Sequence, residues 1–232
     1  MAITDAGQIC ESSATTATTR MTLSGSVKAG ALMVLYLGGR VTSGYLDVAT
    51  ITDSKGHDWD WSGDGEWYGF SSGYRFASLA WAKAGSPMVS GTDWIEVRRS
   101  KTADVAWISG HNYEGAGGTP TEVDATQITP GSSISDAVVL AGSDDLVVAT
   151  VTYAYSSTTT TPMNSMVEED TYDGGNILID ALRRNVTTGP GSFTAGTTFG
   201  AARYATIVIA SFPFSAMPAA ASGRGQSFLI GV

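Results

Sequence analysis

The sequence predicts an all-β fold, a two-sheet antiparallel β-sandwich of jelly-roll-like form. Charged residues are only 15% of the 232 residues, whereas Gly alone occurs 28 times. This composition suits short strands and turns better than long solvated helices. Apolar residues recur with period two in many segments that end at Gly, Pro, Asp or Ser, as strands joined by turns do. Hydrophobic residues make up 43% of the chain, so it can bury a sizeable core.

The clearest strand is the near-continuous apolar run at residues 31–37, which lies between glycines and is typical of a buried strand. Alternating or apolar segments follow at residues 74–83, 94–98, 105–109, 145–155 and 203–214. They are rich in β-branched and aromatic residues, which favour strands. Residues 176–184 fit a helix or a strand equally well, and the pattern leaves both open.

The second half of the chain repeats the order of the first: buried strand, Asp-rich turn, strand, Thr/Ser-rich turn, strand. Leu32 and Leu146 begin matching strands, and Trp107 and Tyr204 lie in matching final strands. If the repeat is real, two similar half-sheets pack face to face, and neither half has another partner for its apolar face. The identity between the halves is weak, so chance convergence of β-patterned sequences is the alternative.

These patterns divide the chain into three segments. Residues 1–19 form an N-terminal arm or edge strand, 20–214 one β-sandwich domain, and 215–232 an extended C-terminal tail. The tail ends with the apolar residues Phe228, Leu229 and Ile230. It either packs back onto its own domain or adds to a neighbouring chain as a strand or plug.

Charge and residue counts exclude several function classes. The net charge of −9 argues against binding nucleic acids or anionic membranes, which requires clustered Lys and Arg. The lone Cys10 excludes an internal disulfide framework, and the two histidines, His57 and His111, exclude a His-rich metal site. No signal-peptide pattern or membrane-spanning apolar run is visible, so we expect synthesis in a cytosol.

The densest polar and aromatic cluster spans residues 57–67. It could offer Ca²⁺ oxygen ligands from Asp58, Asp60, Asp64 and Glu66. The acids do not follow the spacing of an EF-hand loop, so we favour a solvated hairpin tip and predict no cofactor.

Three tryptophans of this cluster, Trp59, Trp61 and Trp67, are the main candidate interaction residues. Tryptophan is enriched at protein–protein contacts, which we rank first. Packing into the protein's own core ranks second, and stacking on a sugar ranks third.

No catalytic motif emerges, and the chain is predicted not to be an enzyme. There is no G-x-S-x-G sequence. A pair of Ser109 and His111 with Asp104 would lie along one strand with side chains about 7 Å apart, too far for a hydrogen bond. Two acidic groups, Asp144–Asp145 and Glu168–Asp170, fit the two-carboxylate requirement of a glycosidase only if a cleft brings acids together.

Several motifs resemble a β-sandwich domain of tailed-bacteriophage virion proteins and some bacterial surface proteins. The resemblance covers roughly residues 20–214 and rests on turn and core signatures. These are a Gly-rich entry to a buried strand at 30–37, Thr-Asp-Ser-x-Gly-x-x-Trp at 52–59, Trp-Ala-x-x-Gly at 81–85, Tyr-x-Gly at 113–115, and the strand opening at 143–148. The sequence departs from the pattern at Ala31, where an acidic residue is usual.

The resemblance implies a non-enzymatic structural component of a bacteriophage virion, a minor tail protein or a capsid decoration protein. Its expected partners are major capsid or tail proteins and further copies of itself, and its expected location is the virion. The alternative is a carbohydrate-binding module for host-surface glycans, which requires an exposed row of Trp59, Trp61 or Trp67.

Overall fold

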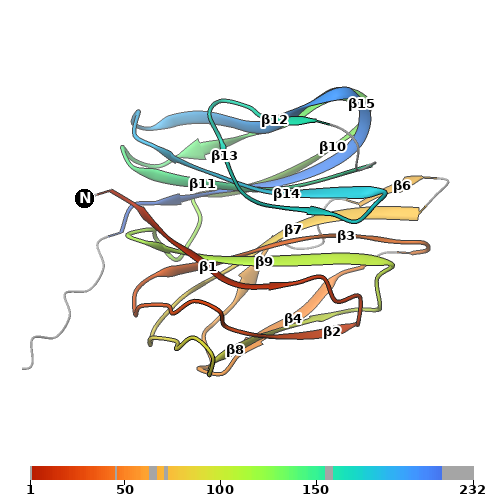
Figure 1. The fold of residues 1–232 in the computed structure, drawn as a ribbon. Coiled ribbons are helices and arrows are strands. Elements are labelled where there is room, and N and C mark those ends of the chain that lie inside the picture. Colours follow the sequence, from red (N-terminus) through yellow and green to blue (C-terminus); the bar gives the residue numbers. More distant parts are fainter. Residues whose placement is uncertain (1, 45, 63–66, 71–72, 155–158, 216–232) are drawn as a thin grey trace, which may run out of the picture.

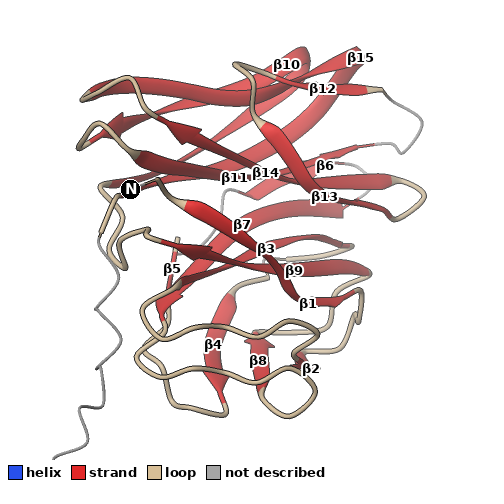
Figure 2. Cartoon of the chain, turned by 60° about the vertical axis from the view of Figure 1, so that its left-hand side comes forward, coloured by secondary structure: helices blue, strands red, loops and turns tan. Residues whose placement is uncertain are grey.

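The computed structural model describes residues 2–44, 46–62, 67–70, 73–154 and 159–215. Phe228, Leu229, Ile230, Asp64 and Glu66 lie outside these residues. The described residues form strands and loops and no helix (Figure 2). The predicted all-β, sandwich-like architecture is therefore confirmed, and residues 176–184 fall in a strand.

The strands form three antiparallel sheets. These stack as four layers, because the second sheet bends and contributes two of them (Figure 1). The first sheet has the order β1 (Thr4–Ser12), β9 (Val105–Glu114), β3 (Leu32–Val41), β7 (Gly73–Lys83), β5 (Asp60–Trp61), with β6 (Trp67–Phe70) also paired to β7. The second has the order β10 (Glu122–Leu140), β15 (Gly191–Pro213), β11 (Asp145–Ala154), β14 (Ile177–Val186), β13 (Val167–Asp173), with β12 (Thr160–Pro162) paired to β15. A small cover sheet has the order β2 (Thr18–Thr22), β8 (Trp94–Arg99), β4 (Val48–Asp53).

The two main sheets share one topology. Each sheet has a main path of five strands. If these strands are numbered by their order in the chain, both sheets have the spatial order 1-5-2-4-3. Strands β3, β7 and β9 therefore correspond to β11, β14 and β15. This is the correspondence that the repeated sequence pattern indicates, since Leu32 opens β3 and Leu146 lies in β11.

The correspondence extends to the outer layers. In the second half, residues 133–140 of β10 pair with residues 191–198 of β15, and β12 pairs beside them. This order matches the cover sheet, in which β2 pairs with β8 and β8 with β4. Strands β10 and β15 shift register between Ile128 and Ser133, so their outer ends belong to the fourth layer. Each half is thus a jelly-roll-like sandwich, and the halves lie back to back.

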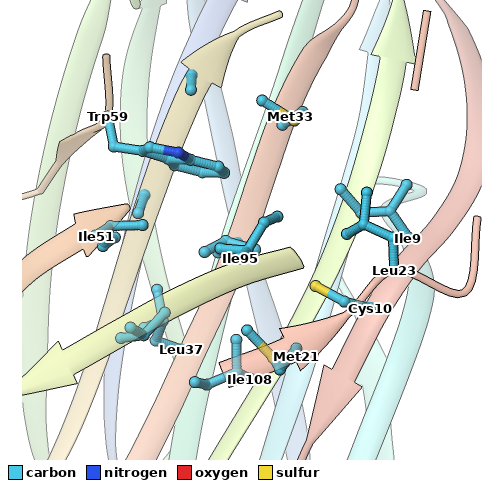
Figure 3. Close-up of a cluster of buried hydrophobic side chains, with 14 of the residues drawn as sticks. Ile9, Cys10, Met21, Leu23, Met33, Leu37, Ile51, Trp59, Ile95 and Ile108 are labelled. Carbon is cyan, nitrogen blue, oxygen red and sulfur yellow. The ribbon is translucent and has the colours of Figure 1, made fainter. Parts of the chain in front are cut away.

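Three hydrophobic cores fill the spaces between the four layers. The outer core of the first half (Figure 3) lies between the first sheet and the cover sheet and contains Leu35, Ile95 and Ile108. The central core joins side chains of both halves: Val34, Leu79, Trp107, Val148, Ile179 and Phe212. The outer core of the second half contains Ile134, Val151 and Ile207.

The middle strands of both main sheets are buried on both faces. In β3, Met33 and Leu35 face the outer core of the first half, whereas Leu32, Val34 and Tyr36 face the central core. A strand in this position needs apolar residues on both sides. This explains the near-continuous apolar run at residues 31–37.

The main sheets lie close together at Gly38. A Cβ atom there would lie 2.5 Å from Ile179 Cγ2 and 2.7 Å from Thr152 Oγ1. Only glycine fits this spacing without displacing buried neighbours across the central core.

Residues near the N-terminus belong to the first sheet. Strand β1 is its edge strand and pairs with β9. Ile9 and Cys10 are buried in the outer core of the first half, so the segment has the position of an edge strand.

Candidate functional site

The loop after β4 is organised by one buried carboxylate, Asp53. Its Oδ2 accepts hydrogen bonds from Trp59 Nε1 at 2.7 Å and from His57 Nδ1 at 3.1 Å. Its Oδ1 accepts the backbone N–H of Lys55 at 2.7 Å and that of His57 at 3.4 Å. His57 Nε2 lies 3.2 to 3.3 Å from polar atoms of Ser86. Both polar ends of the His57 ring are therefore used to fix the loop.

Trp59 belongs to the core and not to an exposed platform. Its side chain is 8% exposed and lies in the outer core of the first half (Figure 3), with its N–H directed to Asp53. The predicted role of Trp59 in contacting a partner or a sugar is corrected accordingly. Packing of the ring, the second-ranked interpretation, describes this residue.

The remaining loop residues differ in exposure. Asp58 and Asp60 are exposed, and Trp61 is half-buried against the outer core of the first half. Trp67 opens β6, where its backbone pairs with Phe76. Asp64 and Glu66, the other two predicted Ca²⁺ ligands, lie outside the described residues.

A pocket of about 350 Å³ lies beside this loop, at the β5–β7 edge of the first sheet. Its lining includes Asp58, Asp60, Trp81, Lys83 and Thr119. Trp81 is 5% exposed, so its ring offers little surface for stacking. The pocket therefore presents two carboxylates beside an ammonium group, a mixture suited to a small polar ligand.

On the opposite side of the molecule, four polar side chains meet where the edges of the two halves come together. We call Asp5, His111, Glu169 and Arg183 the seam cluster. His111 Nδ1 lies 3.2 Å from Glu169 Oε2. Arg183 Nε bonds Glu169 Oε1, and Arg183 Nη2 lies 3.4 Å from Asp5 Oδ2. Asp5 and His111 come from the first half and the other two from the second, so the cluster joins the halves.

The strands that carry the cluster are irregular at this place. The pairing of β13 with β14 shifts register between Glu168 and Asp170, which makes Glu169 the additional residue of a β-bulge. Strand β1 shifts register between Asp5 and Gly7, and Gly7 has a φ of 99°. Bulges redirect side chains at sheet edges, and here both bulged strands contribute a carboxylate to the same point.

Burial and charge set the state of His111. Its side chain is 4% exposed, and burial lowers its pKa. The carboxylates of Asp5, Asp170 and Glu11 oppose this shift, and Arg183 adds to it. The imidazole is therefore held in its neutral form at neutral pH, the form that can ligate a metal.

A second hydrogen-bonded group extends the seam cluster. Asp170 Oδ2 accepts from Gln8 Nε2 at 2.7 Å and from Ser109 Oγ at 2.9 Å. The hydroxyl of Ser109 is thus directed to a carboxylate and not to His111. Asp104 accepts a hydrogen bond from Thr42. The three residues form no nucleophilic relay, in agreement with the sequence argument.

Of the other predicted acids, Asp145 supports the backbone of a turn. Asp145 is buried, and its Oδ2 accepts the N–H of Gly142 at 3.0 Å in the turn before β11. Cys10 is buried as well, and burial raises its pKa to about 12, so the thiol is unreactive.

Sequence reasoning named His111 and Glu169 separately and did not name Asp5 or Arg183. The four residues lie far apart in the chain, and a register shift directs Glu169 inward. No spacing rule could have grouped them.

The comparisons with known proteins found no match: no family model, no curated protein and no solved structure is significantly similar to this chain. Among the described residues, no helix is long and apolar enough to cross a membrane.

Proposed function

We propose that the chain is a non-enzymatic structural component of a bacteriophage virion, a minor tail protein or a capsid decoration protein. The supporting observation is the duplicated jelly-roll-like sandwich, in which His57 and Ser109 form hydrogen bonds with neighbouring carboxylates. Jelly rolls recur in viral capsid and lectin domains. This argument is one of fold-level analogy, to which the resemblance of the turn motifs adds.

The hydrogen bonds of the described residues favour a contact-making role over catalysis. His57 is fixed between Asp53 and Ser86, and Ser109 is directed to Asp170. These side chains position strands and loops. Under this proposal the partners are major capsid or tail proteins and further copies of the chain, and the location is the virion.

The direct test is the protein content of particles made from the genome that encodes the chain. Particles are purified on a density gradient, digested and analysed by quantitative mass spectrometry. The proposal predicts peptides of the chain in the particle band at a constant ratio to the major capsid protein. Recovery only from the soluble fraction would contradict it.

A carbohydrate-binding module is the second candidate, and the pocket beside β5 favours it. Asp58, Asp60 and Lys83 line this pocket and can pair with hydroxyl groups of a sugar. The contact would be polar, because the Trp81 ring is buried. Trp61 and Trp67 remain candidate contacts of this module, and Trp61 lies next to Asp60 in β5.

A glycan array tests this candidate with the wild type and a double variant, Asp58→Asn with Asp60→Asn. Both residues are exposed, so the variant should fold normally. Asp124→Asn, at another exposed position, is the matched control. Binding that the double variant loses and the control keeps would support the candidate. No binding by the wild type at millimolar sugar would exclude it.

A further inference from the structure

We propose that Asp5, His111 and Glu169 bind a divalent transition-metal ion of the zinc class, which links the two halves of the molecule. This site is independent of the proposed virion function. Among the residues that the structure describes, these three form the one group of His, Cys, Asp and Glu side chains whose ligand atoms lie within 4.8 Å of one another.

The state of His111 points to a ligand. Its side chain is 96% buried, yet neither ring nitrogen makes a hydrogen bond in the described structure. Nδ1 faces Glu169 Oε2 at 3.2 Å without hydrogen-bond geometry. Buried polar atoms without partners are costly, so an unpartnered imidazole beside carboxylates indicates that something else satisfies it.

A supporting hydrogen bond orients each carboxylate of the group. Glu169 uses Oε1 to accept from Arg183 Nε, which leaves Oε2 directed toward His111. Asp5 uses Oδ1 to accept the backbone N–H of Gly7 at 2.8 Å. Supporting hydrogen bonds of this kind orient the ligands of protein metal sites. Arg183 is therefore a positioning residue that fixes Glu169 for the ion.

The charges around the site favour a cation despite Arg183. The charged side chains around His111 are Asp5 and Glu11 of β1, Glu169 and Asp170 of β13, and Arg183 of β14. Four carboxylates against one guanidinium leave an excess of negative charge. A divalent ion would neutralise part of that excess.

The donor set defines the class of metal. Imidazole nitrogen and carboxylate oxygen are both zinc ligands, and three such ligands leave a fourth tetrahedral position for water. The same ligand types also suit Mn²⁺ and Fe²⁺. Ca²⁺ fits poorly, because it takes six to eight oxygen ligands. The other His and Cys side chains of the described residues are poor candidates for metal ligands. Cys10 is buried elsewhere, and both ring nitrogens of His57 have hydrogen-bond partners. The ion would join β1 and β9 of one half to β13 of the other.

The test is zinc binding by the full chain without a metal-binding tag. The protein is equilibrated with Zn²⁺, dialysed, and analysed for metal by inductively coupled plasma mass spectrometry, and its Tm is measured with Zn²⁺ and with EDTA. We expect one equivalent of zinc. At zinc concentrations about 100-fold above Kd, Tm should rise by about 5–10 °C. Ca²⁺ should leave Tm unchanged.

Two isosteric variants, Glu169→Gln and Asp5→Asn, should each lower zinc affinity at least about tenfold. Asp5→Asn is informative if the Glu169 variant fails to fold, because Asp5 is partly exposed. Glu168→Gln, on the same strand and exposed, is the control and should bind like the wild type. Substoichiometric zinc in the wild type, equal uptake by Asp5→Asn, or a Tm that responds to Ca²⁺ and not Zn²⁺ would overturn the proposal.

Discussion

The two halves of this molecule have the same strand order but cover their outer faces differently. The first half uses a separate sheet of β2, β8 and β4. The second half uses the bent outer ends of two continuous strands, β10 and β15, with the short β12 beside them. The same topology can therefore be built from separate strands, as in the first half, or from continuous strands that bend, as in the second. In both cases each layer must present an apolar face.

The halves also differ in how each satisfies a buried carboxylate. Asp53 of the first half accepts four hydrogen bonds, two from backbone N–H groups and two from ring N–H groups. Asp180 of the second half accepts two, from the hydroxyls of Tyr153 and Thr171, each at 2.9 Å. Burial raises the pKa of Asp180 to about 7. The charged form of Asp180 is therefore disfavoured in the folded state.

The largest expected effect is that of Asp53→Asn. The amide NH₂ group would replace one acceptor oxygen and face N–H donors that then have no partner. We expect a loss of about 3 kcal/mol in the free energy of unfolding. Urea denaturation at pH 7 measures it. A loss below about 0.5 kcal/mol would show that the loop does not depend on the carboxylate.

The second effect concerns the contact between the halves. Gly38→Ala places a Cβ against Ile179 and Thr152 across the central core. Overpacking of this kind should cost about 2 kcal/mol. Gly85→Ala is the control, because its Cβ would meet only His57, at 4.0 Å, and its cost should be within about 0.5 kcal/mol. Equal denaturation midpoints for the two variants would argue against close sheet packing at Gly38.

The third effect depends on pH and comes from Asp180→Asn. The pKa of Asp180 rises from an ordinary 3.8 to about 7 in the folded state. The folded protein thus holds the proton more tightly, and its unfolding free energy falls as pH rises from about 4 to about 7. Each pKa unit corresponds to about 1.4 kcal/mol, so the loss is at most about 4 kcal/mol.

The neutral variant avoids this loss, although it disturbs two hydrogen bonds. If the disturbed hydrogen bonds cost about 2 kcal/mol at every pH, Asp180→Asn should be about 2 kcal/mol less stable than the wild type at pH 4 and about 2 kcal/mol more stable at pH 8. Thermal unfolding across this pH range measures the difference. A variant that is less stable at pH 8 would show that the carboxylate is stabilising, as we expect for Asp53.

Much of the fold followed from local patterns. The largely apolar segments at residues 31–37 and 145–154 mark the central strands, because strands buried on both faces carry apolar residues on both sides. The repeat between the halves was also visible in the sequence. It pairs β3 with β11, β7 with β14, and β8 and β9 with the two parts of β15. Strand β10 was not, because Pro130 and Gly131 resemble a turn, whereas the chain only bends there. The separate cover sheet was also missed, since period two does not say which sheet a strand joins.

The candidate sites were less predictable. Trp59 looked like an exposed aromatic residue because its sequence neighbours are acids and glycines, yet Asp53 draws its N–H inward. The seam cluster depends on two bulges and on contact between the halves. Both are tertiary features, and a linear pattern does not encode them.

The central claim is that the two sandwiches share one core and form a single cooperative unit, because the central core takes side chains from both. Differential scanning calorimetry of the full chain tests it most directly. We predict one transition with equal calorimetric and van't Hoff enthalpies. Two separable transitions, one for each half, would contradict it.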